Sequence, residues 1–517
     1  MMKSQQSIAI SVKHKLLLVL LSLIGTGIIL VATTRYGAGI SPDSVSYIAT
    51  ARHLADGMGF ITFNNAPLLV QPPLYPTILG TIAFVFGVDP LVSANFVSAI
   101  FFGLALYLSG LLFLEYLSPS LALLGTASLL VSIPLTTVSF MAWSEPPFVF
   151  FVALYLFALS MYSENKNIKS LLLLSLSGAL ACLTRYIGVT LVLTGIISIL
   201  IIQHNSLKTK LSHAFTFAFV SVLPVSIWIG RNYILSKTLF GPRSPSLHSL
   251  SDNIRYTFDT ILQWYVPSRV VDSRPMLMLL GLIVGFLMGV IFVWQKTPTT
   301  KLLKRTRPIV IFILLLIFGY TGFLIISSTT TNYDSIGDRL LSPIFIPTTL
   351  LLFVVVEIVS KKIKEHFPTK PVELLLMAGI VLWLIYPARA TVLNVVTQFQ
   401  EGNGYSAKSW KNSQTIQYIR ENNLSDCTIY SNGADVTYLL LDINVKSIPA
   451  KSSGANTIAD ISSLENNFPQ ESKACIVWFN QITWRTYLFT PDELASVTNS
   501  ERVVQLDDGT IYFVSRK

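Results

Sequence analysis

Charged side chains and cysteine are scarce in this chain of 517 residues. Asp, Glu, Lys and Arg together make up 12% of it, against about 25% in an ordinary globular protein. There are three cysteines, too few for a small secreted domain that depends on disulfides. Hydrophobic residues instead make up 52%, and the mean hydropathy is +0.60. These values exclude a soluble enzyme, a disordered scaffold and a disulfide-stabilised secreted domain.

Motifs for common cofactors and metals are also missing from the sequence. There is no P-loop, no Rossmann glycine fingerprint, no His-Glu-x-x-His, no Cys-x-x-Cys and no Asp-x-Asp triplet. The six histidines are scattered, and basic residues do not cluster with stacking aromatics as they do in nucleic-acid-binding proteins. The sequence therefore indicates no cofactor, leaves a divalent metal open, and argues against nucleic acid as a partner.

Long apolar runs take up most of the chain instead. A helix needs about 20 apolar residues to cross the hydrocarbon core of a bilayer. We expect eleven transmembrane helices, at residues 16–34, 90–114, 119–138, 146–162, 170–184, 187–202, 214–232, 276–294, 308–327, 339–360 and 371–390. The runs at 170–184 and 187–202 fit one long helix as well as two, which would change the count. The sequence predicts a polytopic α-helical membrane protein in which residues 1–390 form the transmembrane domain.

Basic residues differ in type between the two predicted faces of the membrane. With a cytoplasmic N-terminus, the inner segments hold 14 Lys and 2 Arg, and the outer segments hold 10 Arg and 1 Lys. Lysine suits a topology anchor, whereas the planar fork of arginine fits a phosphate with two hydrogen bonds. The pattern predicts a cytoplasmic N-terminus and a phosphorylated ligand at the outer face. Pairing of these arginines with helix carbonyls and nearby acids is an equal alternative for each one.

Residues 391–517 have a different character. They hold 10 basic and 13 acidic residues, a net charge of −3, whereas residues 1–390 hold 27 and 14, a net charge of +13. Amphipathic stretches alternate with short β-rich runs, which predicts a small α/β domain outside the cytoplasm. The expected strands are 428–431, 445–448, 475–479, 502–506 and 510–514. Cys427 and Cys475 each stand at the head of an expected strand, so a disulfide and two buried free thiols are both open.

The first outer loop, residues 35–89, contains two stretches with helical periodicity that are too short to span a membrane. We expect both to lie in the plane of the interface, with the first beginning at Pro42. Asp43 stands at this helix start, where a carboxylate accepts bonds from the first amides and suits the helix dipole. Spacing alone therefore favours a capping role for Asp43 over that of a general base.

Further acids stand at the ends of later spans. Glu145 is the only acid in its short outer turn, and it is either a site residue or another cap. Asp334, Asp338 and Arg339 precede a span interrupted by prolines. Charges at the mouth of a membrane domain are costly to keep, and a functional site and a structural ion pair are equally consistent with this group.

Several segments resemble the GT-C glycosyltransferases, most specifically at residues 35–87. They are Asp43-Ser-Val-Ser-Tyr47, Ala51-Arg52-His53, Gln71-Pro-Pro-Leu-Tyr-Pro76, Trp143-Ser-Glu145-Pro, Leu183-Thr-Arg185-Tyr186, Arg231-Asn232-Tyr233, and Arg339 ahead of Pro343. Within that superfamily, the chain is similar to the branch of protein O-mannosyltransferases and the aminoarabinose transferase of lipid A, which is glycosyltransferase family 39-like.

The resemblance implies an inverting enzyme, a hexosyl- or pentosyltransferase, that moves a sugar from a polyprenyl-phosphate donor to an acceptor hydroxyl on the extracytoplasmic face. It implies that Asp43 is the catalytic base and that Arg52, in the same helix, faces the lipid phosphate. The other substrate-binding candidates are Tyr47, Glu145, Arg185, Arg231, Asp338 and Arg339. The chain departs from the family at Gln71, where relatives often have His or Lys, and at Ser44, where many have a second acid.

Two other functions remain open at this point. An arginine-lined mouth and many spans also suit a transporter or flippase for an anionic lipid-linked substrate, and a GT-C-like chain can serve as a catalytically inactive subunit. The acceptor can be a lipid, a glycan or a protein, and membrane lipids are expected partners in every case. A transferase requires Asp43, whereas a transporter should tolerate Asn at that position.

Overall fold

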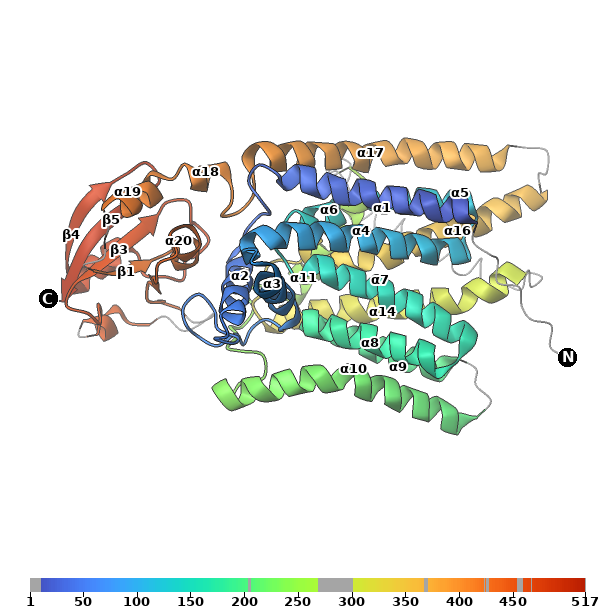
Figure 1. Cartoon of the computed structure of the whole chain (residues 1–517), viewed down its shortest axis with the longest axis horizontal. Helices are drawn as coiled ribbons and strands as arrows, with labels where there is room; N and C mark the ends of the chain where they lie inside the picture. The colour runs from blue at the N-terminus through green and yellow to red at the C-terminus, as the bar shows by residue number, and fades with distance from the viewer. Residues whose placement is uncertain are drawn as a thin grey trace.

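The computed structural model describes residues 11–202, 206–267, 301–366, 371–422, 424, 427–452, 459–465 and 467–516. Long helices lie side by side along the longest axis of the molecule, and a small β-sheet stands at one end of them (Figure 1). Two short helices of the first outer loop, α2 (Pro42–Ala55) and α3 (Leu74–Phe86), lie at that same end of the bundle.

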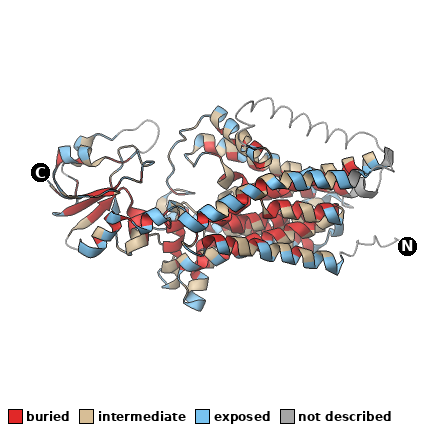
Figure 2. Ribbon diagram, turned by 90° about the horizontal axis from the view of Figure 1, so that it is seen from above, coloured by how far each residue is buried: buried red, intermediate tan, exposed pale blue. Residues whose placement is uncertain are grey.

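Seven of the described helices are long and apolar enough to cross a membrane. They are α1 (Val12–Thr33), α4 (Pro90–Tyr116), α7 (Glu145–Asn165), α10 (Leu207–Ser236), α14 (Lys301–Thr330), the run from α15 (Asp338–Leu341) into α16 (Phe345–His366), and α17 (Val372–Glu401). Buried residues lie inside the bundle and exposed ones on its outer surface (Figure 2). Many of the exposed residues on the long helices are large and apolar. Apolar surface on this scale is covered by lipid, so the chain is an integral membrane protein.

The other predicted spans are bent, short or outside the described residues. Residues 119–138 form α5 (Pro119–Leu130) and α6 (Ile133–Ser139), which meet at 47°. Pro134 stands in the first turn of α6, where a residue needs no N–H because that group has no partner within the helix. In the interior of one continuous helix the same proline would leave a hydrogen bond unmade, so α5 does not continue into α6. The predicted span at 276–294 lies outside the described residues. Among the residues described, seven helices pass the length test, or eight with the bent pair, where the sequence predicts eleven spans.

The runs at 170–184 and 187–202 are two separate helices, α8 (Ile168–Thr184) and α9 (Val189–Ile201). Gly188, between them, lies so close to the backbone of α8 that a Cβ there would be 2.6 Å from the amide nitrogen of Cys182. A Cβ on Gly178 of α8 or on Gly195 of α9 would touch the ring of Phe217 in α10. The chain therefore folds back on itself, and the single long helix is wrong.

The helices expected in the first outer loop are present, and local sequence explains their ends. Ser41 and Ser44 form a capping box at the start of α2, with Pro42 in the first turn. Gly87 ends α3 in the left-handed conformation, with φ of 67°. The rings of Tyr47 and Tyr75 pack edge to face at 5.0 Å between centroids and join the two helices.

The chain after α17 forms a five-stranded sheet of order β2-β1-β3-β5-β4. Its strands are β1 (Thr428–Ser431), β2 (Lys446–Ser447), β3 (Ala474–Phe479), β4 (Thr498–Gln505) and β5 (Gly509–Arg516). The first three are parallel, and β5 is antiparallel to both neighbours. The helices α18 (Lys408–Lys411), α19 (Gln414–Asn422), α20 (Ala434–Leu441) and α21 (Pro491–Val497) accompany the sheet. Each expected strand is found, with ends that differ by a few residues at most.

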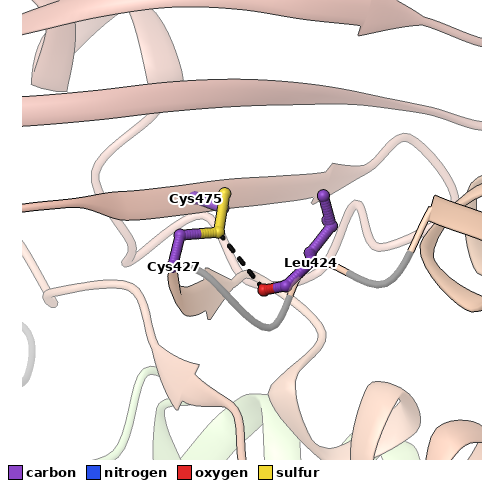
Figure 3. The surroundings of a disulfide bond; sticks show 3 residues. All are labelled: Leu424, Cys427 and Cys475. Atoms are coloured by element: carbon purple, nitrogen blue, oxygen red, sulfur yellow. Dashed lines mark hydrogen bonds between the residues drawn. A yellow bond between two sulfur atoms is a disulfide. The ribbon is translucent and has the colours of Figure 1, made fainter.

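A disulfide joins Cys427 to Cys475, as one of the two sequence-based alternatives has it. Cys475 lies in β3 and Cys427 immediately before β1, and the carbonyl oxygen of Leu424 lies 3.5 Å from the Cys427 sulfur (Figure 3). Because β1 and β3 are parallel neighbours with Ile429 opposite Cys475, the two thiols meet without rearrangement of the backbone.

A short extended segment before α2 joins the bundle to the sheet region. Gly39 exchanges backbone hydrogen bonds with the chain at Met141, and Ile40 does so with the chain at Gly404. Gly404 has φ of 57°, and a Cβ on it would lie 2.0 Å from the carbonyl oxygen of Ile40, so only glycine fits there. Buried side chains from α2 and α3 also share one hydrophobic core with Trp410 and Phe479. The two regions are therefore packed as one body.

Candidate active site

A cavity of about 1510 Å³ opens between the helical bundle and the sheet region. Its walls come from the start of α2, the segment 70–72, the facing sides of α10 and α14, and the segments 450–452 and 484–487 of the sheet region. Four of the charged residues singled out in the sequence, Asp43, Arg185, Asp334 and Arg339, line it. The cavity thus brings together charges from positions up to 296 residues apart.

Asp43 is the second residue of α2, and it does not cap the helix. Ser41 takes that role through its hydroxyl, so the capping function favoured by spacing is wrong. The Asp43 carboxylate instead accepts hydrogen bonds from the side-chain amide of Gln71 (3.0 Å) and from the guanidinium of Arg339. Both partners lie outside α2, so tertiary packing alone orients this carboxylate.

Burial and charge act in opposite directions on Asp43. Partial burial alone would raise the pKa of its carboxyl, but the charge of Arg339, hydrogen bonds from Arg339 and Gln71, and the charge of Arg185 outweigh it and lower that pKa. The side chain keeps 37% of its surface exposed. Asp43 is therefore an ionised carboxylate at neutral pH that remains accessible from the cavity.

Arg339 connects three acids. Its Nη2 donates to Asp43, its Nε donates to Glu145 (2.7 Å) and its Nη1 donates to Asp334 (2.8 Å). The guanidinium also lies over the ring of Trp143, 4.3 Å from its centroid. Arg339 is the second residue of α15, whose N-cap is Gly337, and its side chain lines the cavity. The ion pair left open by the sequence is thus present, and it is part of the cavity wall.

Glu145 lies behind these arginines and is fully buried. One carboxylate oxygen accepts from both Arg185 and Arg339, and the other has no hydrogen-bond partner among the described residues. Glu145 is the first residue of α7, and Arg185 immediately follows α8. One buried negative charge therefore holds two guanidinium groups side by side, although like charges repel.

Hydroxyl groups stand beside the charges. The hydroxyl of Tyr47 lies 3.2 Å from that of Ser144, and burial, together with the negative charges of Asp43 and Glu145, raises the pKa of Tyr47. Tyr320 also lines the cavity and donates to the carbonyl oxygen of Leu340 (2.7 Å). The Tyr47 phenol therefore stays protonated at physiological pH.

Three predicted site residues lie elsewhere in the described structure. Arg52 pairs with Asp89 at the start of α4, with nitrogen–oxygen distances of 2.9 and 3.2 Å. Arg231 donates to the carbonyl oxygen of Leu68 (2.6 Å) and covers the ring of Trp228. Asp338 accepts from the indole of Trp264 (2.8 Å).

Sequence reasoning missed several members of the site. The sequence marks Gln71 only as a departure from the family pattern, whereas in the structure its side-chain amide donates to Asp43 and orients it. Trp143 belongs to a segment that resembles the family, but the sequence does not indicate that its ring packs against Arg339. Tyr320 lies in an apolar run, and Trp484 and Tyr487 lie in the predicted α/β region, so no motif marks these three residues. Among the residues that the structure describes, no group of three or more His, Cys, Asp and Glu is placed to hold a metal ion.

Comparisons with known proteins show which class of protein this chain resembles in sequence and fold. Residues 70–228, less than half of the chain, match the family model described as dolichyl-phosphate-mannose-protein mannosyltransferase. A search of curated protein sequences found no match. The solved structures named next are GT-C glycosyltransferases, so the resemblance noted from the sequence is confirmed.

Among the solved structures, the chain is similar to ArnT from Cupriavidus metallidurans in the apo state, with a TM-score of 0.63 at 12% identity over 96% of this chain and 97% of that one. For the same protein bound to undecaprenyl phosphate, the TM-score is 0.60 with the same identity and coverage. The archaeal oligosaccharyltransferase AglB from Archaeoglobus fulgidus, in complex with an inhibitory peptide and a dolichol-phosphate, gives 0.52 at 12% identity over 91% of this chain and 70% of that one.

Proposed function

We propose that the chain is an inverting glycosyltransferase that moves a sugar from a polyprenyl-phosphate donor to an acceptor hydroxyl at the extracytoplasmic face. One observation carries the proposal. An ionised, accessible carboxylate, Asp43, shares a cavity at the end of a membrane bundle with three guanidinium groups, and two of these, Arg185 and Arg339, are the cations that lower its pKa. A carboxylate suits the acceptor proton, and guanidinium groups suit the lipid phosphate.

The proposed reaction is a single displacement. The acceptor oxygen attacks the anomeric carbon while its proton passes to Asp43, and the bond from that carbon to the phosphate oxygen breaks on the opposite side. The electron pair stays on the phosphate, whose charge goes from one negative unit toward two. Arg185 and Arg339 therefore stabilise the transition state more than the bound donor. No covalent intermediate forms, so the anomeric configuration inverts.

Arg339 connects donor binding to the strength of the base. In the described structure it neutralises Asp43 and lowers the pKa of that carboxyl. A donor phosphate competes for the same guanidinium, and the carboxylate then loses part of its cationic partner. The proton affinity of Asp43 thus rises when the donor is in place, which is when a base is needed.

Two features support the placement of the site outside the cytoplasm. Lysines lie in and beside the turn between α7 and α8 and in the first turn of α10. These helix ends are at the end of the bundle opposite the sheet (Figure 1). Lysine-rich loops favour the cytoplasmic side. The disulfide lies at the sheet end, and disulfides persist in oxidising compartments.

The test compares Asp43→Asn with Asp442→Asn in protein reconstituted into nanodiscs. Asp442 is exposed and has φ of 55°, a left-handed conformation that Asn also adopts readily, so the control makes the same chemical change without strain. With a panel of polyprenyl-phosphate sugars and an envelope extract as acceptor, we expect release of polyprenyl phosphate from wild type and the control. In Asp43→Asn, release should fall by about 10²–10⁴-fold, the usual contribution of a general base.

Three outcomes separate the competing functions. Equal release from Asp43→Asn and wild type would remove Asp43 from the base role while leaving the transferase class. Movement of labelled donor across the bilayer without release would favour a transporter or flippase. Donor binding with neither release nor movement would favour an inactive subunit.

A further inference from the structure

The sheet region contributes a second, chemically distinct part of the cavity wall. Its lining residues are Ala450, Ser452, Trp484, Thr486 and Tyr487, none of which carries a charge. Trp484 and Tyr487 have 53% and 45% of their surface exposed. Large aromatic rings on a wetted surface are costly unless a ligand covers them. This part of the wall thus differs from the charged part around Asp43.

The backbone that carries these rings is held firmly. Arg485 stands between them in sequence and turns inward, where it donates to both carboxylate oxygens of Asp435 (3.0 and 2.6 Å) and to the carbonyl oxygen of Asn432 (2.6 Å). Asp435 is buried and also accepts from the hydroxyl of Tyr405 (2.9 Å). Arg485 is thus a positioning residue that fixes the path of the segment 484–487.

A second contact ties this segment to the other lining segment. Ala450 and Leu488 form an antiparallel bridge, and the carbonyl oxygen of Tyr487 accepts from the amide of Lys451 (2.8 Å). Tyr405 adds a connection to the charged site, since its amide donates to the carbonyl oxygen of Ile40 (2.8 Å), just before α2. The aromatic wall and Asp43 are therefore held on one connected framework.

We propose that Trp484 and Tyr487 form the acceptor subsite and that the acceptor bound there is a neutral saccharide. A sugar ring has one face of C–H groups, which packs on an aromatic ring, and a rim of hydroxyls, which the hydroxyls of Ser452, Thr486 and Tyr487 can bind. The proposal rests on the proposed function, because the hydroxyl to be glycosylated must reach from this subsite toward Asp43.

The charges nearby favour a neutral saccharide over an anionic or peptide acceptor. The described cations of the sheet region beside the subsite are already paired, Arg485 with Asp435 and Lys451 with Glu493 (3.1 Å). Arg243, which lines the cavity from the segment after α10, donates to the carbonyl oxygen of Val70 (3.0 Å) and is not part of the sheet-region wall. An extended peptide would be expected to pair with a strand edge. The edge strands of the sheet, β2 and β4, do not line the cavity among the described residues.

The test uses the full chain in nanodiscs on an array that carries neutral glycans, anionic glycans and Ser/Thr-containing peptides. The variants are the double change Trp484→Ala with Tyr487→Ala, the conservative Trp484→Phe, and the control Phe513→Ala. Phe513 is a matched control because it is 45% exposed on β5 of the same sheet and does not line the cavity. We expect wild type and the control to bind the same neutral glycans. The double variant should bind them at least about tenfold more weakly, and Trp484→Phe should retain most of the affinity.

Kinetics with a bound glycan as acceptor give a second readout. We expect the double variant to raise KM for the acceptor by a similar factor. Without acceptor, slow transfer of the sugar to water also releases polyprenyl phosphate, and the rate of this hydrolysis should stay at the wild-type value. Binding of peptides or anionic glycans instead, no glycan binding by wild type, or unchanged affinity in the double variant would each overturn the proposal. Failure of the proposed function is seen separately, as unchanged release in Asp43→Asn.

Discussion

Glu145 offers a direct test of the charge arrangement at the site. Its buried carboxylate is the shared partner of Arg185 and Arg339, and both guanidinium groups are largely shielded, with 18% and 17% of their side chains exposed. Glu145→Gln keeps the shape of the side chain and removes only the negative charge. Two neighbouring cations are then left with one anion fewer between them.

The expected cost can be bounded from general behaviour of buried ion pairs. Removal of one partner of a buried pair destabilises a protein by about 3–5 kcal/mol, because a charge is left without compensation. Here the lower end, about 3 kcal/mol, applies, since Arg339 keeps Asp43 and Asp334 as partners and some water reaches both guanidinium groups. We expect a clear fall in the midpoint of thermal unfolding of the protein in nanodiscs.

Added phosphate should distinguish an anion site from a merely structural ion pair. In Glu145→Gln, inorganic phosphate can take the place of the missing charge between the arginines. A ligand that binds only the folded state at ten times its Kd stabilises that state by roughly 1.4 kcal/mol. We therefore expect phosphate to raise the unfolding midpoint of Glu145→Gln more than that of wild type, at equal ionic strength set with chloride.

Glu357→Gln is the matched control. Glu357 is a buried acid in α16 that pairs with Lys361 and accepts from Ser118, and it does not line the cavity. Its replacement should also lower the unfolding midpoint, but phosphate should restore nothing specific. If phosphate stabilises the two variants equally, or stabilises Glu145→Gln no more than wild type, then Arg185 and Arg339 do not form an anion site and the reasoning fails.

Three further predictions follow from the structure. The pKa of the Asp43 carboxyl is lowered, so its share of stability and of base function is present at neutral pH and is lost only as pH falls through that lowered pKa. We therefore expect kcat/KM to stay level down to about pH 5, one unit above the ordinary pKa of aspartate; a decline that begins near pH 6 would contradict this. Arg52→Ala should lower the free energy of unfolding by at most about 1 kcal/mol and leave KM for the donor unchanged, because the partner of Arg52, Asp89, is exposed and outside the cavity. A tenfold rise in that KM would instead show that Arg52 contacts the donor phosphate, as the family resemblance implies. The Cys427–Cys475 disulfide closes a loop of 48 residues, so its reduction should destabilise the sheet region by about 4 kcal/mol in the chain-entropy model. The measurement is the unfolding midpoint with and without reductant, and an unchanged midpoint would refute this prediction.

Local signals in the sequence were sufficient for much of the fold. The long apolar runs, the capping residues around Pro42 and the alternation along the five strands each act over a few neighbours, and the structure places helices and strands at those positions. The errors are also physical in origin. The count of spans rests on hydropathy. Hydropathy separates the runs on either side of Gly188, as the structure does, but it does not register the bend between α5 and α6 or the short lengths of α8 and α9.

The sequence by itself determined that this is a membrane protein with a small α/β region, and the motif around Asp43 pointed to the residue that the structure places in the cavity. Only the tertiary structure decided which arginines accompany it. Arg185 and Arg339 meet Asp43 and Glu145 across large separations in sequence, while Arg52, nine residues from Asp43, pairs elsewhere. Chain-local spacing cannot predict such partners, because a charge pairs with whatever the packing of distant helices brings within reach of its side chain.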